Sequence, residues 1–330
     1  MTSISRKKGD ARPVILILAH ARKEKLEQTL RALALANITH RHRIIACVDG
    51  DDPGVLEALG RGIDPEFLLQ SRSLGNLPVS SRIRSSLRTG LSLGFSTLGA
   101  PYVTVIEDDI VVAPDFLDFV SASHMQFGST RRYRGVNGFS RVSDLPGPAL
   151  EKKRLVAKLN FGLGWGWSIT AQIYARIEPY LSQEQTSEDH WDGLIETYVR
   201  SGFVINPIVS RIKNLGFDAS ASHTSGQDSK KIGAEISKSF EANFSPTGKP
   251  IADLRIVSTP FPWRFDCVNL ATMNSIQRTV YYFALSTTSK VKRYKSSRNT
   301  KISRLAKLLS DRLYSNLINR YFFVHRHNGL

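Results

Sequence analysis

The feature that most constrains the fold is a short apolar run followed by a polar turn and a helix-like segment, which recurs in the first third of the chain. Residues 13–19 (PVILILA), 43–48 (RIIACV) and 102–106 (YVTVI) are strand-sized and mostly apolar. Such runs are typical of parallel strands buried on both faces. We therefore predict an α/β, Rossmann-like fold with a mixed, mainly parallel sheet flanked by helices.

Helices are expected between and after these strands. The first follows residue 22 and has a leucine stripe. The stripe consists of Leu26, Leu30, Leu33 and Leu35. Two further helices are expected at residues 80–98 and 169–180. Ligands bind at the carboxyl ends of parallel strands. Arg22, Asp49 and an acidic triplet each follow one of these strands, so we predict a ligand site there.

Composition excludes wholesale disorder and a membrane-spanning helix. The 330 residues are 41% hydrophobic, and no apolar run approaches the roughly 20 residues that a span needs. The basic residues 6–8 precede too short an apolar run for a cleaved signal peptide. Cys47 and Cys267 fit neither a disulfide framework nor a metal–thiolate site, which favours a reducing compartment. We expect a cytoplasmic protein.

Positive charge is concentrated at the C-terminal end. The formal charge is +16, and residues 278–330 contain twelve Lys and Arg against one acid, Asp311, which amounts to +11. We therefore predict a basic extension at residues 1–12, a catalytic-type body at 13–275 and a basic helical appendix at 276–330. The body is expected to have halves of about 13–120 and 121–275.

The triplet Glu107, Asp108 and Asp109 ends the third apolar run and is followed by another, residues 110–112. Adjacent carboxylates repel each other and cost stability unless a cation offsets them, so a divalent metal is the natural partner. The alternative is a solvated acidic turn that opens a helix capped by Asp115. The apolar flanks favour the metal, because they restrict solvation.

The sequence around the triplet, VIEDDIVVAPDF at residues 105–116, resembles the β-1,2-N-acetylglucosaminyltransferase I family of inverting GT-A glycosyltransferases. The resemblance spans roughly residues 13–226 and includes five further motifs in the same order. These are Gly-Leu-Gly-Trp at 162–165, Glu-Pro at 178–179, Trp-Asp at 191–192, Asn-Pro-Ile-Val-Ser-Arg at 206–211 and Ala-Ser-His at 221–223.

The resemblance implies roles for the strand-end residues. Asp109 would coordinate Mn²⁺ (or Mg²⁺) between the phosphates of a UDP-sugar, and Glu107 and Asp108 would orient its ribose and sugar. Arg22 would approach the nucleotide, and Asp49 would accept a hydrogen bond from uracil. The metal would stabilise the charge on departing UDP.

Simpler readings of two of these residues stay open. Arg22 alone could be an exposed residue at a helix start, and Asp49 an ordinary turn residue. Asp51 and Asp52 are rivals for the uracil contact.

The resemblance makes Asp192 the general base that takes the proton of the acceptor hydroxyl, beside Trp191 at the donor site. Glu188 and Asp189 are rivals for this role, and Asp192 could instead only cap a helix.

Other family-like residues would also contact the sugar donor. Gly164 would allow close backbone approach, and Trp165 would offer a flat face to a sugar or fill the core. His223 would approach the diphosphate or the metal, although a loop histidine often does neither.

The basic appendix has an amphipathic pattern over residues 301–323. It could lie on an anionic membrane or pack on the body. The chain has no nucleic-acid-binding motif, and the acidic triplet would repel a phosphate backbone, so nucleic acid is disfavoured as a partner.

Together these features predict a hexosyltransferase-type enzyme (EC 2.4 class) that moves a sugar, GlcNAc by resemblance, from a UDP-sugar to a glycan or glycolipid acceptor. The lack of the N-terminal anchor of the Golgi relatives favours bacterial surface-polysaccharide synthesis at the inner face of the plasma membrane. The alternatives are another donor, UDP-Gal or UDP-Glc, or a non-catalytic peripheral membrane or nucleic-acid-binding protein.

Overall fold

The computed structural model describes residues 11–36, 41–71, 77–140, 154–159, 164–182, 198–199, 201–216 and 254–256. All of them belong to one compact unit, Met1–Val268. No helix in these segments is long and apolar enough to cross a membrane. The basic appendix at 276–330 lies outside the described residues, so its amphipathic helix and the proposed domain limits stay predictions.

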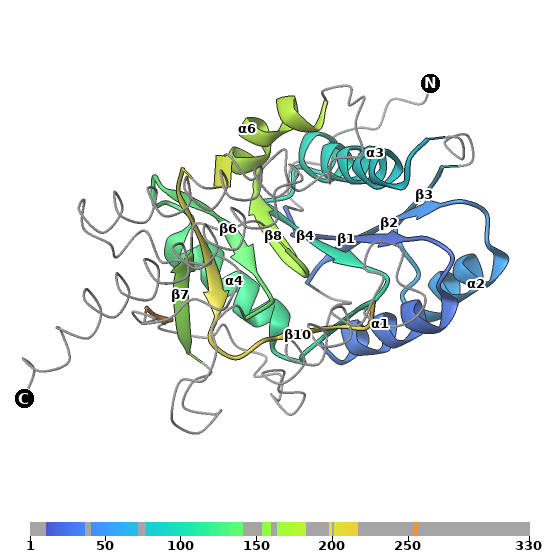
Figure 1. The fold of residues 1–330 in the computed structure, drawn as a ribbon, viewed down its shortest axis with the longest axis horizontal. Helices are drawn as coiled ribbons and strands as arrows, with labels where there is room; N and C mark the ends of the chain where they lie inside the picture. The colour runs from blue at the N-terminus through green and yellow to red at the C-terminus, as the bar shows by residue number, and fades with distance from the viewer. Residues whose placement is uncertain are drawn as a thin grey trace, which may run out of the picture. The chain divides into compact units, whose positions relative to one another are not determined.

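The described segments form a nine-stranded mixed sheet (Figure 1), in the order β11-β7-β9-β6-β8-β4-β1-β2-β3. The N-terminal strands are β1 (Val14–Ala19), β2 (Arg43–Asp49), β3 (Phe67–Ser71) and β4 (Tyr102–Glu107). The pairs β1–β2, β2–β3 and β1–β4 are all parallel. The predicted α/β fold with a mainly parallel sheet is confirmed.

The other half of the sheet mixes strand directions. Its strands are β6 (Tyr133–Asn137), β7 (Leu155–Leu159), β8 (Trp167–Thr170), β9 (Phe203–Pro207) and β11 (Arg255–Ile256). Strand β8 runs antiparallel to both β4 and β6, and so it joins the two halves. The pair β6–β9 is parallel and β7–β9 is antiparallel.

Helices cover both faces of the sheet, as Figure 1 shows. Helices α1 (Lys23–Leu35) and α2 (Pro53–Gly62) lie on one side, and α3 (Val79–Ser92) and α6 (Ala171–Leu181) lie on the other. Every residue of β1 is buried, because strands flank it and helices cover it on both faces. The continuous apolar run in the sequence reflects this double burial.

Three details differ from the expected helices. Leu26, Leu30 and Leu33 face the core, but Leu35 is 67% exposed because it ends α1. Helix α3 continues into a π-helical turn, η1 (Leu93–Thr97), within the range expected to be one helix. The helix expected from residue 169 begins at Ala171, because the preceding residues pair with β4 and β6 as strand β8.

A two-stranded antiparallel ribbon lies beside the main sheet and begins directly after the acidic triplet. It consists of β5 (Ile110–Val112) and β10 (Ile212–Asn214). Helix α4 (Phe116–Phe127) follows β5. The ribbon therefore brings residues near position 214 against residues near position 109.

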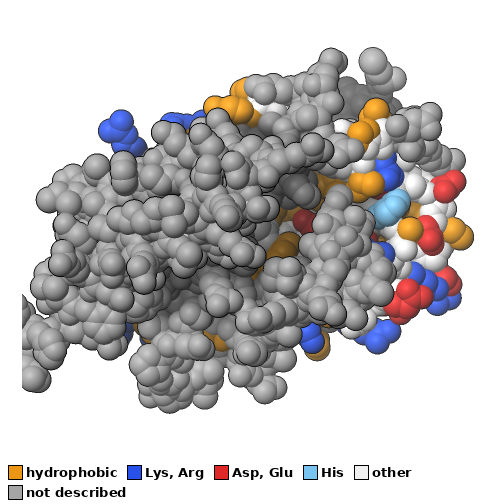
Figure 2. Space-filling model, viewed as in Figure 1, with side chains coloured by type: hydrophobic (Ala, Val, Ile, Leu, Met, Phe, Trp, Pro, Cys, Tyr) orange, Lys and Arg blue, Asp and Glu red, His pale blue; other side chains and the backbone are white. Residues whose placement is uncertain are grey.

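The surface over α1 and α2 carries both signs of charge, at the right of the view in Figure 2. There Lys23 and Arg61 both pair with Glu57, and Arg31 pairs with Glu27. Because these charges compensate locally, this surface is not a cationic patch, and the excess positive charge of the chain is not concentrated there.

Candidate active site

The strand order places a topological switch point between β1 and β4. The chain proceeds from β1 outward to β2 and β3, and then returns to the other side of β1 as β4. Ligands of open α/β sheets bind beyond the carboxyl ends of the strands at such a point. Arg22 follows β1, and Asp108 and Asp109 follow β4, so these side chains meet at that edge.

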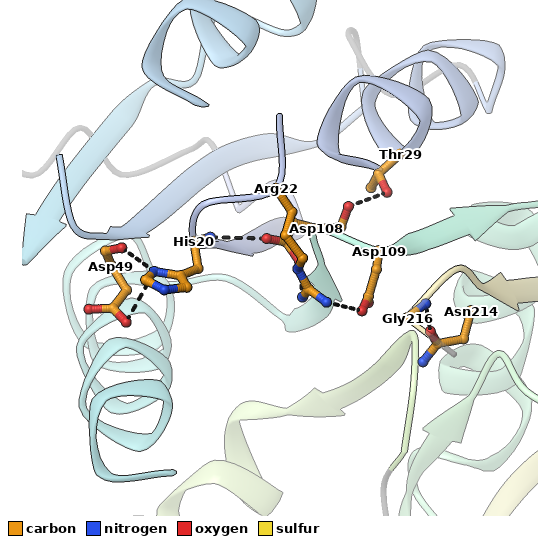
Figure 3. Close-up of polar contacts among 8 residues, drawn as sticks. All are labelled: His20, Arg22, Thr29, Asp49, Asp108, Asp109, Asn214 and Gly216. Atoms are coloured by element: carbon orange, nitrogen blue, oxygen red, sulfur yellow. Dashed lines mark hydrogen bonds and ion pairs between the residues drawn. The ribbon is translucent and has the colours of Figure 1, made fainter. Parts of the chain in front are cut away.

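Arg22 joins the two aspartates (Figure 3). Its Nη1 donates to Oδ2 of Asp109 at 2.7 Å, and its Nη2 donates to Oδ1 of Asp108. The Arg22 side chain is 26% exposed, whereas the side chains of Asp108 and Asp109 are only 2% and 7% exposed. Arg22 does stand at the start of α1, as the simpler reading expected, but it is only partly exposed, because its guanidinium bridges two nearly buried carboxylates.

Asp108 is anchored by the backbone as well. The backbone N–H of His20 donates to its Oδ2 at 3.0 Å, and Oγ1 of Thr29 donates to its carbonyl oxygen at 3.0 Å. These contacts tie the end of β4 to β1 and α1. Asp108 is therefore a fixed part of the site's wall.

Asp109 faces the ribbon and has spare hydrogen-bonding capacity. Its carbonyl oxygen accepts from the N–H of Leu215 at 2.8 Å, and Gly216 passes so close that a Cβ there would lie 2.3 Å from Oδ2 of Asp109. Oδ1 of Asp109 is buried and has no hydrogen-bond partner among the described residues. A buried carboxylate oxygen without a donor is costly, so this atom could accept a contact from a ligand.

The two charged groups shift each other's pKa. Burial has the largest effect on Asp109 and raises its pKa; Arg22 opposes the rise and Asp108 adds to it, and the net pKa stays above its ordinary value. Burial lowers the pKa of Arg22, but the charges of Asp109 and Asp108 outweigh it, so the net pKa is raised. Arg22 stays charged, while an ionised Asp109 favours a nearby cation.

Glu107 is the last residue of β4 and pairs in register with Leu18 of β1. It is partly buried, and its charge is one of those that raise the pKa of Arg22. The whole predicted triplet therefore lies at the switch point, with Asp109 nearest the ribbon.

Asp49 ends β2, next to β1, at the same edge of the sheet. Its Oδ2 accepts from Nη1 of Arg82 at 2.5 Å, and its backbone oxygen lies 2.6 Å from Nδ1 of His20. Its rival Asp52 caps α2 by accepting from the N–H groups of Gly54 and Val55. The carboxylate of Asp52 thus serves as a helix cap, whereas Asp49 contacts Arg82 and His20. Asp51 is exposed and stays a rival for the uracil contact.

His20 and Arg82 are site residues that the sequence analysis missed. His20 bridges the ends of β1, β2 and β4 through its backbone N–H and its ring, as Figure 3 shows. Its signal was a polar residue that ended an otherwise apolar strand. Arg82 lies in the first turns of α3, and only the fold brings it to Asp49.

Gly164 and Trp165 lie at the other half of the sheet. The N–H of Gly164 donates to Oδ1 of Asn137 at 2.9 Å, and Asn137 in turn donates to Asn206 at 3.2 Å. Trp165 packs edge-on against Phe139, with ring centroids 5.1 Å apart. These contacts place Gly164 and Trp165 beside β6 and β9, and their predicted role at the sugar donor stays a prediction.

Five predicted site residues lie outside the described residues. These are Glu188, Asp189, Trp191, Asp192 and His223. The base assignment to Asp192, its two rivals and the roles of Trp191 and His223 stay predictions.

A second arginine–aspartate pair supports the ribbon. Arg211 and Asp115 are both completely buried, with Nε 3.4 Å from Oδ2. The guanidinium lies 4.4 Å from the ring centroid of Phe119, and burial lowers the pKa of Arg211 although Asp115 opposes this. Asp115 occupies the N-cap position of α4 but makes no side-chain capping bond there, so the expected cap is instead an ion-pair residue.

The surroundings of Asp109 fit a hard divalent cation. Carboxylate oxygens are suitable ligands, Oδ1 of Asp109 is buried without a partner, and Gly216 leaves the carboxylate uncrowded by a side chain. No group of three or more His, Cys, Asp or Glu placed to hold a metal occurs among the described residues. A cation here would therefore need further ligands from water or from a bound phosphate.

No protein-family model matches the sequence. Among solved structures, the chain is similar to Staphylococcus aureus TarS residues 1–349, with a TM-score of 0.42 and 9% identity over 61% of this chain and 59% of that one. The complex of TarS 1–349 with UDP gives 0.41 and 10% over the same shares. A structure of TarS gives 0.40 and 10%, over 59% of this chain and 35% of that one. The chain thus spans less than two thirds of the TarS structures that it matches.

Proposed function

We propose that this chain is an inverting glycosyltransferase of the GT-A type that uses a UDP-sugar. The observation that carries the proposal is the contact of Arg22 with Asp108 and Asp109 at the switch point, with Asp49 at the end of the neighbouring strand β2 on the same edge of the sheet. Binding of a nucleoside diphosphate needs a cationic side chain for the phosphates, a polar group for the nucleobase and a carboxylate for the metal ion. Arg22, Asp49 and Asp109 would supply these groups. The ordered motifs that resemble the N-acetylglucosaminyltransferase I family favour the same chemistry.

Asp49 would select the base. Uracil presents an N3–H donor to a carboxylate, whereas cytosine presents an acceptor at that position, so an ionised Asp49 favours uracil. Arg82 and His20 hold the carboxylate and the backbone of Asp49, which restricts its movement. We therefore assign specificity for UDP over CMP to this residue.

Asp109 would hold the divalent cation, Mn²⁺ or Mg²⁺, together with the diphosphate. When bound, the cation would act as a Lewis acid that stabilises the negative charge of the departing UDP. Asp108 keeps the end of β4 in place, and Arg22 adds a second positive charge toward the diphosphate. The remaining part of the reaction is attack by an acceptor hydroxyl, whose proton Asp192 would take as general base, with Glu188 and Asp189 as alternatives.

The finer assignments follow the resemblance. GlcNAc is the favoured sugar, and the acceptor is a glycan or glycolipid of a surface polysaccharide, reached at the inner face of the membrane with help from the basic appendix. UDP-Gal and UDP-Glc are the alternative donors.

The variant Asp109→Asn tests the core of the proposal. Donor hydrolysis or transfer with Mn²⁺ should fall by about 100-fold or more, because losing even an outer partner of a metal ligand costs about 10–100-fold. The measurement is release of UDP from UDP-GlcNAc, UDP-Gal and UDP-Glc, with GDP- and CMP-sugars as negative controls.

Asp64→Asn is the matched control, because it removes an exposed carboxylate that follows the C-terminal end of α2, away from the site edge. It should leave UDP release within about twofold, as surface substitutions usually do. Full activity of Asp109→Asn, or no binding of any UDP-sugar by the unaltered chain, would refute the proposal.

A further inference from the structure

The carboxylate pair at the switch point already holds a cation of its own. Arg22 contacts Asp108 and Asp109 at once, and both carboxylates are nearly buried. The guanidinium thus neutralises the position at which a metal ion would need a ligand. One positive charge faces two aspartates, so the cluster still has negative charge to spare.

The two carboxylates that Arg22 bridges differ in how many other hydrogen bonds hold them. Asp108 also accepts from the backbone of His20, so it stays in place without Arg22. Within the described residues, Arg22 donates a hydrogen bond to Oδ2 of the Asp109 carboxylate, and Oδ1 has no partner. The Arg22–Asp109 contact is therefore the one that an incoming cation would replace.

Arg22 can move without disturbing the fold around it. It occupies the N-cap position of α1 and makes no side-chain capping bond there, while its backbone carbonyl accepts from Leu26 at 3.0 Å. The helix start is held by the backbone, and the Arg22 side chain as a whole is 26% exposed. Rotation of the side chain alone would free Asp109.

We propose that Arg22 and a divalent metal ion compete for Asp109, and that the metal enters as Arg22 leaves Asp109 for an anionic ligand. Two cations on one carboxylate repel each other at short range in a poorly solvated site. A bare metal ion would therefore bind weakly, whereas a diphosphate would supply negative charge for both cations. The diphosphate step rests on the proposed function, but the competition for Asp109 does not.

The test is binding of Mn²⁺ alone, measured by electron paramagnetic resonance of the free ion at pH 7.5. Arg22→Gln should bind Mn²⁺ about tenfold more tightly than the unaltered chain, because the ion no longer has to displace a charge-assisted hydrogen bond from Asp109. Arg22→Lys keeps the charge but cannot bridge both carboxylates, so it should also bind Mn²⁺ more tightly, by a smaller factor. Thermal unfolding of each variant checks that it is folded.

Lys25→Gln is the matched control. Lys25 lies on α1 and lowers the pKa of Asp109 through its charge. Arg22 lowers the same pKa both through its charge and through a hydrogen bond. Removal of Lys25 changes the field at Asp109 but not the direct contact, so Mn²⁺ affinity should change by less than about twofold. The double variant Arg22→Gln/Asp109→Asn should lose the tight Mn²⁺ site.

Equal or weaker Mn²⁺ binding by both Arg22 variants would overturn the proposal, as would an equal gain in Lys25→Gln. Addition of UDP separates this outcome from the proposed function. UDP should tighten Mn²⁺ binding to the unaltered chain, and it should do so less in Arg22→Gln. If UDP has no effect on any form, the nucleotide proposal fails, while the comparison with Mn²⁺ alone still decides the competition.

Discussion

Two arginine–aspartate clusters lie at opposite ends of the same short ribbon, and they differ in charge balance and in exposure. Arg22 shares one guanidinium between Asp108 and Asp109 and is 26% exposed. Within the described residues, Arg211 pairs with the carboxylate of Asp115, and neither side chain is exposed. Two carboxylates for one guanidinium, close to solvent, can accept a cationic ligand, whereas a one-to-one pair with no exposed surface is out of reach of a ligand from solvent. The first cluster therefore has the character of a site and the second that of a scaffold.

The largest effect should come from breaking the sealed pair. Asp115→Asn removes the carboxylate that balances the buried charge of Arg211, which costs about 3–5 kcal/mol of unfolding free energy. Urea denaturation followed by circular dichroism measures this loss. Replacing both residues by apolar ones, as in Arg211→Met/Asp115→Leu, should restore most of it. A loss below about 1 kcal/mol, the range of exposed pairs, would contradict a structural role.

An intermediate effect is expected at Arg82, which positions Asp49 at the site edge. Arg82→Gln should weaken UDP binding about tenfold, because a charge-assisted hydrogen bond that orients the carboxylate is lost. Isothermal titration with UDP measures the change. Arg88→Gln, on the same helix but paired with Glu178 at 3.7 Å, is the control and should bind UDP normally. Unchanged affinity in Arg82→Gln would mean that Asp49 is held without it.

The smallest effect concerns stability at the first cluster. The pKa of Asp109 is raised in the folded state, so its contribution to stability is greatest below its unfolded pKa and is lost as pH rises through the folded value. Asparagine does not ionise, so Asp109→Asn does not lose stability as the pH rises. Its free energy of unfolding at pH 7.5 should equal that of the unaltered chain or exceed it by up to about 1 kcal/mol.

Urea titrations of Asp109→Asn from pH 4 to 8 should also show a flatter pH dependence than the unaltered chain. A clear destabilisation of this variant at pH 7.5 would make the first cluster a scaffold like the second, and the contrast between the two clusters would disappear.

Much of the fold was predictable because its central strands are buried on both faces. The runs at 13–19, 43–48 and 102–106 are apolar for that reason, and each became a parallel strand. The segment from Trp167 to Thr170 was assigned partly to a helix. It forms a strand because it pairs with β4 and β6, partners distant in sequence.

The site was predictable to the extent that its residues immediately follow strands. Arg22, Asp49, Asp108 and Asp109 all do so, and adjacent parallel strands gather such residues at one edge. Arg82 and Gly216 lie elsewhere in the sequence and reach the site through α3 and the β5–β10 ribbon. No local pattern distinguishes them from an ordinary helix arginine or loop glycine.

The sequence by itself determined which segments become buried strands and which carboxylates follow them, because double burial demands apolar runs and interrupts them only at their ends. Only the tertiary structure decided how those charges are shared: one guanidinium for two aspartates at the switch point, and one for one in the core. Charge pairing depends on distances between elements, and these are set when the sheet, its helices and the ribbon pack together.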